Sequence, residues 1–187
     1  MTSENAPVVF CPTAGSAPDG FVISHLPHGL VEVRFLNETL TQVVRRRRSG
    51  HIHEEVLYLG LLTLQSGSSG EPGITYKPLS DLTSMFPLTV GDSHELSMEV
   101  AFAGRVQRIE TSAISVRSKK QLKIGLCRYD VFTIAVTFDP PGQASVFYDY
   151  SPELRCILNT AVGGRSLNKG VIRPLSELPA LISAMAE

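Results

Sequence analysis

Residues 30–36 read Leu-Val-Glu-Val-Arg-Phe-Leu, and here Val31, Val33 and Phe35 alternate with charged residues. A period of two is typical of a β-strand that buries one face. The same period recurs along most of the chain, where Gly, Ser, Asn or Pro marks the turns between strand-like segments. These segments are 21–26, 30–36, 40–48, 51–65 (one long strand, or two broken near Gly60), 74–77, 93–102, 106–116, 120–126, 129–138, 144–150 and 155–162.

This succession predicts a mainly β protein, with a curved antiparallel sheet of about ten strands that forms a half-barrel or open barrel. Residues 1–19 are rich in Pro, Gly, Ser and Ala and are expected to form a flexible N-terminal arm. A loop is expected at 66–73 and a C-terminal helix at 174–185, where apolar residues recur at helical spacing. The helix is a candidate to cover one face of the sheet. Residues 20–187 are therefore expected to form a single domain.

The charge composition limits the possible partners. The 187-residue chain has 17 Lys and Arg against 18 Asp and Glu, a net charge of −1. Such a balance argues against a nucleic-acid partner, because phosphate binding needs an excess of cations. Acidic residues predominate over 49–100 and basic residues over 101–128, which predicts charge pairing between neighbouring strands. No apolar stretch reaches the length that spans a bilayer, so no transmembrane segment is expected.

The three cysteines, Cys11, Cys127 and Cys156, fit no metal-binding or redox spacing. A bridge between Cys127 and Cys156 is possible if their strands are neighbours, and buried free thiols are the alternative. The N-terminal residues lack the basic region and apolar core of an intact signal peptide. Two locations stay open: the cytoplasm, if Met1 is the true start, or the periplasm or cell envelope, if a leader has been removed.

His51 and His53 flank Ile52, so on a strand both imidazoles point to the same side. This spacing makes them the candidates for a metal site, although a solvated pair beside Glu54 and Glu55 is the commoner outcome. No cofactor is expected.

Four consecutive arginines occupy positions 45–48. Because successive side chains of a strand alternate between its faces, the run is not expected to form one four-arginine surface. A solvated sheet edge that discourages aggregation is the expected role.

No catalytic set stands out in the sequence. There is no GxSxG motif and no Cys beside a His, and Glu54 and Glu55 would face apart on a strand. A non-enzymatic protein is therefore favoured. Two alternatives stay open: a small hydrolase-type enzyme that uses a pocket histidine, such as His25 or His51, and a protein-interaction module that uses the basic strands.

Three segments carry a resemblance to a known group of proteins. Residues 86–92 read FPLTVGD, residues 125–132 read GLCRYDVF and residues 148–154 read YDYSPEL. In order and spacing they resemble motifs of the DUF3108-like bacterial envelope proteins of unknown function, which are similar to the lipoprotein carriers LolA and LolB. Asp149 stands where the family motif has Trp. The resemblance implies a curved antiparallel sheet around an apolar groove and a periplasmic or surface location, and it carries over no catalytic residue.

The function expected from this reading is a non-enzymatic cell-envelope protein. Its concave face would bind an apolar small molecule, a lipid or a lipid-like segment, or contact another envelope protein. Core packing is the commoner role for aromatic residues, since cores and pockets share composition. The candidate groove residues are Phe35, Phe102, Phe132, Phe138, Phe147 and Tyr150.

Overall fold

The computed structural model describes residues 10–139, 145–160 and 170–186. Within them the chain forms one antiparallel sheet and a single α-helix, which confirms the predicted fold class. The strands are β1 (Phe21–Ser24), β2 (Gly29–Phe35), β3 (Leu40–Arg47), β4 (Ile52–Tyr58), β5 (Leu62–Ser68), β6 (Ile74–Pro78), β7 (Ser93–Phe102), β8 (Arg105–Ile124), β9 (Cys127–Asp139), β10 (Val146–Ser151), β11 (Cys156–Thr160) and β12 (Val171–Pro174). The helices are two 3₁₀ turns, η1 (Thr83–Met85) and η3 (Leu175–Glu177), and α1 (Leu178–Ala186).

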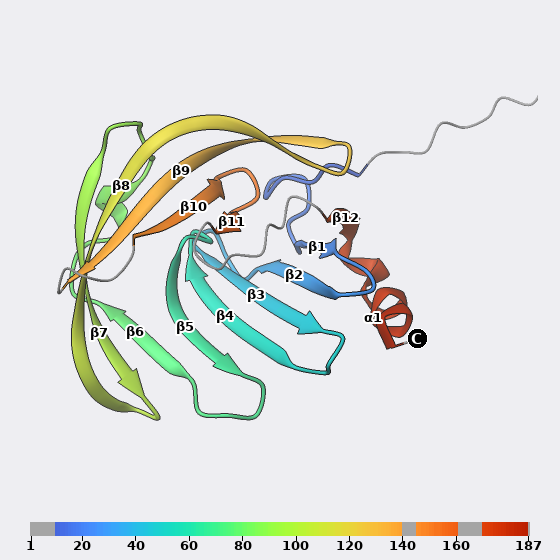
Figure 1. The fold of residues 1–187 in the computed structure, drawn as a ribbon, viewed down its shortest axis with the longest axis horizontal. Coiled ribbons are helices and arrows are strands. Elements are labelled where there is room, and N and C mark those ends of the chain that lie inside the picture. The colour runs from blue at the N-terminus through green and yellow to red at the C-terminus, as the bar shows by residue number, and fades with distance from the viewer. Residues whose placement is uncertain (1–9, 140–144, 161–169, 187) are drawn as a thin grey trace, which may run out of the picture.

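The sheet is a meander of twelve strands that curls without closing into a barrel. Each strand from β1 to β10 pairs with the next along the chain, and β12 returns to pair with β1. The two edges are therefore β11 and β12. In Figure 1 the long β8–β9 hairpin arches over strands β2–β5, and β10 and β11 lie between them.

Several boundaries differ from the sequence prediction. The segments predicted at 106–116 and 120–126 are one strand, β8, because a bulge between Val116 and Ser118 lets pairing with β9 continue past Ser118. Residues 66–68, predicted as loop, extend β5. Of the two alternatives for 51–65, the break near Gly60 is confirmed: the segment is two strands, since Leu59 and Gly60 turn the chain with positive φ angles of 48° and 71°.

The C-terminal helix begins later than predicted. Residues 171–174 form β12, whose register places Ile172 opposite Ile23 and Pro174 opposite Phe21. The α-helix then starts at Leu178. Proline can end a strand at a sheet edge because its missing N–H costs no ladder hydrogen bond there.

Two cores fill the inside of the curve, and a third lies under the helix. The first core joins β1–β4 to β9 and β11 through residues such as Ile23, Val33 and Leu158. The second core joins β5 and β7–β10 with the segment around η1. The third packs Leu178 of α1 against Val22 of β1. Since Val22 and Ile23 are consecutive on a strand, α1 covers the face of β1 opposite to the first core.

Residues 10–19, predicted as part of a flexible arm, are attached to the sheet. A disulfide joins Cys11 to Cys127 at the start of β9. Next to it, the Tyr129 hydroxyl donates a hydrogen bond of 3.0 Å to the carbonyl of Pro12. The candidate bridge between Cys127 and Cys156 is therefore wrong: Cys156 is a buried free thiol. Residues 1–9 lie outside the described part of the chain.

The helices of the described chain are all shorter or less apolar than a bilayer-crossing helix must be.

Candidate functional site

A cleft of about 1560 Å³ opens inside the curve of the sheet, and we call it the interior cleft. Its walls come from the β1–β5 side of the sheet and from β10–β12. The cleft exists because β10 and β11 fold back inside the curve, at a distance from β3 and β4 that the side chains of the two cores only partly bridge.

One part of the interior cleft is apolar. Val31, Leu57 and Leu61 contribute to it from the β1–β5 side, and Ile157 of β11 lies across from them. Leu57 and Leu61 are only 3% and 5% exposed, so they belong to the cores and also present an edge to the cleft. An aliphatic chain could lie against this surface.

The other part of the interior cleft is basic. We call this part the basic rim and define it by side chains at the ends of β1–β4. They are His25, His28, Arg45, Arg47, Arg48, His51 and His53.

The pairing of two turns explains why the rim residues gather. Arg48 N–H, in the β3–β4 turn, donates a hydrogen bond of 3.3 Å to the carbonyl of His28 in the β1–β2 turn. Gly29 pairs with Arg47, and a Cβ at Gly29 would lie 2.6 Å from the Arg46 carbonyl oxygen. Glycine at position 29 therefore allows the two turns to approach this closely.

The expected role of the arginine run is wrong in two respects. The strand β3 is not an edge, because it pairs with β2 on one side and β4 on the other. All four of Arg45–Arg48 also contact the interior cleft. Alternation holds only within the strand: Arg45 pairs with Glu55 and Arg46 with Glu32, while the chain turns after Arg47 and brings Arg48 back to the rim.

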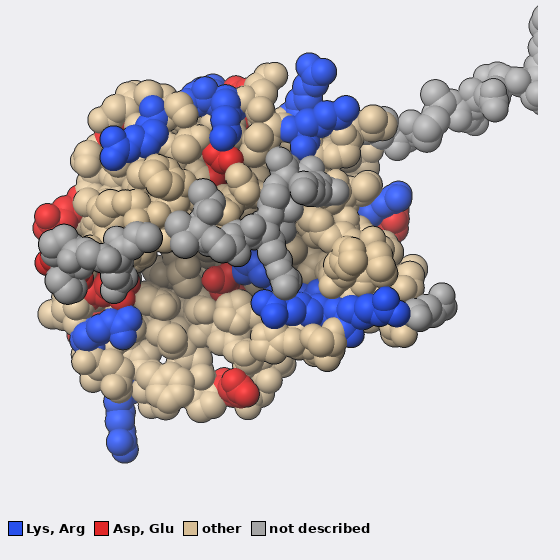
Figure 2. Space-filling view, in the orientation of Figure 1, with Lys and Arg blue, Asp and Glu red and all other residues tan. Residues whose placement is uncertain are grey.

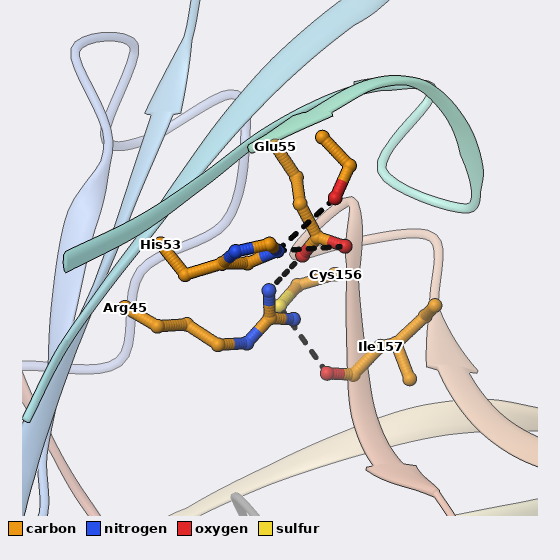
Figure 3. A network of polar contacts seen from close by, with 6 residues as sticks. Arg45, His53, Glu55, Cys156 and Ile157 are labelled. Carbon is orange, nitrogen blue, oxygen red and sulfur yellow. Dashed lines mark hydrogen bonds and ion pairs between the residues drawn. The ribbon is translucent and has the colours of Figure 1, made fainter. Parts of the chain in front are cut away.

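A polar network lies on the wall of the interior cleft, where Arg45, His53 and Glu55 point toward one another and toward the Cys156–Ile157 segment of β11 (Figure 3). Glu55 forms an ion pair with Arg45. The Nε2 atom of His53 lies 3.1 Å from the Ser66 hydroxyl and 3.9 Å from Glu55 Oε1. Arg45 and His53 are directly opposite each other in the β3–β4 register, which sets this geometry.

Burial and neighbouring cations keep His53 neutral. Burial, followed by the positive charges of Arg45 and of neighbouring basic residues, lowers the pKa of His53. Burial also lowers the pKa of His25, with a further contribution from His28. Both imidazoles are therefore uncharged at pH 7 and gain a proton only on acidification.

The residues Ser66, His53 and Glu55 do not form a catalytic triad. In such a triad the acid orients the histidine through one ring nitrogen and the hydroxyl contacts the other. Here both partners lie nearest to Nε2, and Glu55 is already paired with Arg45. The thiol of Cys156 is no better as a nucleophile, because burial raises its pKa to about 11.

His51 and His53, the candidates for a metal, both line the interior cleft. In the part of the chain that the structure describes, no three His, Cys, Asp or Glu residues come together as a metal site requires. The histidine pair thus lies in the cleft without a third ligand among those residues.

The six candidate groove residues do not gather around one groove. Tyr150 is 2% exposed and its hydroxyl donates a hydrogen bond of 2.6 Å to the Leu59 carbonyl, which ties β10 to the β4–β5 turn. Phe132 and Phe138 pack against the second core, whereas Phe102 and Phe147 are exposed. Phe35 packs against the first core below the guanidinium of Arg155.

A second polar cluster, which the sequence analysis missed, surrounds Asp149 of β10. This carboxylate is 5% exposed, and it accepts hydrogen bonds from Thr133 at 2.8 Å and Asn159 at 3.1 Å and pairs with Lys120 at 2.8 Å. Burial opposes ionisation, but the three donors hold the pKa of Asp149 below its usual value. The signal available in the sequence was an aspartate within the strand-like segment 144–150.

Comparisons of the chain with models of protein families, with curated proteins and with solved structures found no match. The resemblance to the DUF3108-like and LolA-like proteins therefore stays a prediction.

Proposed function

We propose that this protein is a non-enzymatic binding protein of the bacterial cell envelope that holds an amphiphilic molecule in its interior cleft. The observation that carries the proposal is the cleft itself, a volume of about 1560 Å³ whose wall is apolar on one side and basic on the other. Pockets for drug-sized ligands span roughly 300–1,000 Å³, so this volume suits a ligand with a long chain.

The envelope location is supported by the disulfide. The Cys11–Cys127 bond joins residues that are 116 positions apart and attaches the N-terminal residues to β9. Structural disulfides form and persist in oxidising compartments and are rare in the cytosol. A protein that uses such a bond to attach the residues before its first strand is suited to the periplasm or cell surface.

A binding role is also supported by the chemistry of the cleft wall. Its one serine–histidine contact lacks the geometry of a triad, and the thiol beside it is protonated at neutral pH. The hydroxyl and the thiol are not activated for nucleophilic attack, whereas His53 and Glu55, which line the cleft, can form hydrogen bonds to a ligand.

The test uses the disulfide-intact protein and the uncharged fluorescent probe N-phenyl-1-naphthylamine. We expect saturable binding that increases probe fluorescence. The variant Thr63→Trp places a large side chain in the cleft wall and is expected to abolish binding. The matched control Thr137→Trp, at an exposed position of β9, is expected to bind as the wild type does. Absence of saturable binding to the wild type, or equal binding to both variants, would overturn the proposal.

A further inference from the structure

The basic rim concentrates positive charge in a nearly neutral chain. The interior cleft is lined by five arginines and four histidines, and Glu55 is the acidic residue among its described lining residues. The whole chain has a net charge of −1 and five histidines, so four of the five face one cleft. In Figure 2 one row of Lys and Arg side chains lies beside the hollow, and other basic side chains are spread over the top and left of the view.

Some of these cations already have partners. Arg45 pairs with Glu55, Arg46 with Glu32, and Arg173 lies 3.9 Å from Glu177. Glu32 is only 2% exposed, so the guanidinium of Arg46 serves first to neutralise a buried carboxylate.

Arg47 and Arg48 differ from their neighbours. Within the described residues neither has a carboxylate within ion-pair distance. The Nε2 atom of His25, on the same rim, is buried and has no hydrogen-bond partner there. Two exposed guanidinium groups without a carboxylate partner and a buried imidazole nitrogen without a hydrogen-bond partner thus share one rim, where the positive charge favours an anionic ligand over a neutral one.

We propose that the basic rim binds a phosphate-type anion, carried either by the head group of an amphiphile or by a free phosphate ester. Arg47 and Arg48 would supply the forked N–H donors that match phosphate oxygens, with His25, His28 and His51 as further donors. The inference deepens the proposed function and rests on it for the apolar part of the ligand.

A small anion fits this site better than a nucleic acid does. The rim is confined to one cleft at the ends of β1–β4, whereas a nucleic acid needs an extended basic track with a large cation excess. The other basic stretch, on β8 and β9, is partly neutralised because Lys119 pairs with Asp130 and Lys120 with Asp149.

The rim also makes binding depend on pH. Besides the four rim histidines, the charged and titratable groups among the described lining residues are Arg45, Arg46, Arg47, Arg48, Arg173, Glu55 and Tyr148. The arginines keep their charge, whereas His25 and His53 can gain a proton on acidification. A bound anion favours their protonated form, but a phosphate ester also takes up a proton at about pH 6, so the two effects on affinity oppose each other. The stability of the free protein should fall on acidification, because the pKa values of His25 and His53 are lowered on folding.

The test measures the affinity of dodecyl phosphate below its micelle concentration by calorimetry, with dodecyl maltoside as the uncharged comparison. The rim variant is Arg47→Gln with Arg48→Gln. The matched control is Lys123→Gln with Arg128→Gln, two exposed cations that face each other near the tip of the β8–β9 hairpin. We expect the rim variant to lose about tenfold or more in dodecyl phosphate affinity, and the control to lose less than about twofold.

A competition experiment distinguishes a free phosphate from the head group of an amphiphile as the ligand. Inorganic phosphate that competes with dodecyl phosphate identifies a site for the free anion as well, whereas no competition identifies a site for the head group of an amphiphile. Equal losses in the two double variants, dodecyl phosphate binding no tighter than dodecyl maltoside, or tighter binding of a single-stranded oligonucleotide would each overturn the inference. Uncharged probe binding is expected to stay unchanged in the rim variant, so failure of this inference is distinguishable from failure of the proposed function.

Discussion

Side chains alternate between the two faces of the sheet in both halves, but the inward-facing residues differ between the halves. In the packed half, formed by the second core on β5 and β7–β10, inward-facing positions stay apolar, as Ile134 and Val136 do along β9. In the cleft half, formed by β1–β4 with β11 and β12, the inward face of β3 begins with the core residue Val43 and continues with Arg45. The comparison shows that a single strand can contribute to the core at one position and to a binding cleft a few residues further along.

The halves are also held together differently. The packed half relies on side-chain burial and on the Tyr150 hydroxyl. In the cleft half, the Cys11–Cys127 disulfide fastens the N-terminal residues beside the first core.

The largest effect is expected from the disulfide. Cys11→Ser should lower the free energy of unfolding by about 4 kcal/mol, since the bond closes a loop of more than a hundred residues in the unfolded chain. Urea unfolding with and without reductant measures this. Reductant should destabilise the wild type to a similar extent and leave Cys11→Ser unchanged; equal unfolding midpoints of wild type and variant in oxidising buffer would contradict the expectation.

A matched pair of leucine substitutions compares the two halves directly. Leu96 of the packed half is 4% exposed, and Leu57, at the interior cleft, is 3% exposed. Leu96→Ala is expected to lower the free energy of unfolding by about 3 kcal/mol, and Leu57→Ala by about 2 kcal/mol. The loss at Leu57 is smaller because the space that the side chain leaves merges with a cleft that water can enter. Thermal or urea unfolding measures both values, and a larger loss for Leu57→Ala would show that the cleft is closed around that residue.

A smaller effect is expected at Asp149, and it depends on pH. The lowered pKa of this carboxyl means that its contribution is complete above the unfolded value of about 3.9 and is lost as the pH falls through the folded value. Asp149→Asn should lower the free energy of unfolding by about 2 kcal/mol at pH 7. The loss is moderate because the partner Lys120 is partly exposed and can be solvated by water when the carboxylate is removed.

Urea unfolding between pH 7 and pH 3 provides the measurement at Asp149. The wild type and Asp149→Asn should converge toward acid pH. The pKa values of Asp81 and Asp130 are also lowered, but both groups are the same in the two proteins and cancel in the difference. Parallel curves would mean that the ionised carboxylate adds no stability.

Much of the fold could be predicted because the signal is local. Alternation along Leu30–Phe35 and its repetition predict the strands, and short turns predict that consecutive strands pair. The strand β12 was missed because four residues are too few to show the alternation of a strand. Its partner β1 also lies at the other end of the chain. The attachment of Cys11 likewise depends on a neighbour brought close only by the folded sheet.

The candidate site was less predictable. The histidine pair at positions 51 and 53 lies in the interior cleft, but the six aromatic residues are distributed between the cores and the surface. Alternation describes which face Arg45 takes, yet it does not show that the β3–β4 turn lies against His28. A binding rim built from two turns is a property of their contact, which no single segment encodes.

The pairing of β12 with β1 has a consequence for how the protein avoids self-association. During synthesis β2 to β11 can form as successive hairpins, while one edge of β1 stays unpaired until Val171–Pro174 arrives. That edge belongs to Phe21, Val22 and Ile23, none of which is exposed in the complete fold. An uncovered apolar edge strand recruits strands from other chains. The strand β12 therefore acts as a cover, and a variant without Val171–Pro174 would present a surface suited to assembly into oligomers or fibres.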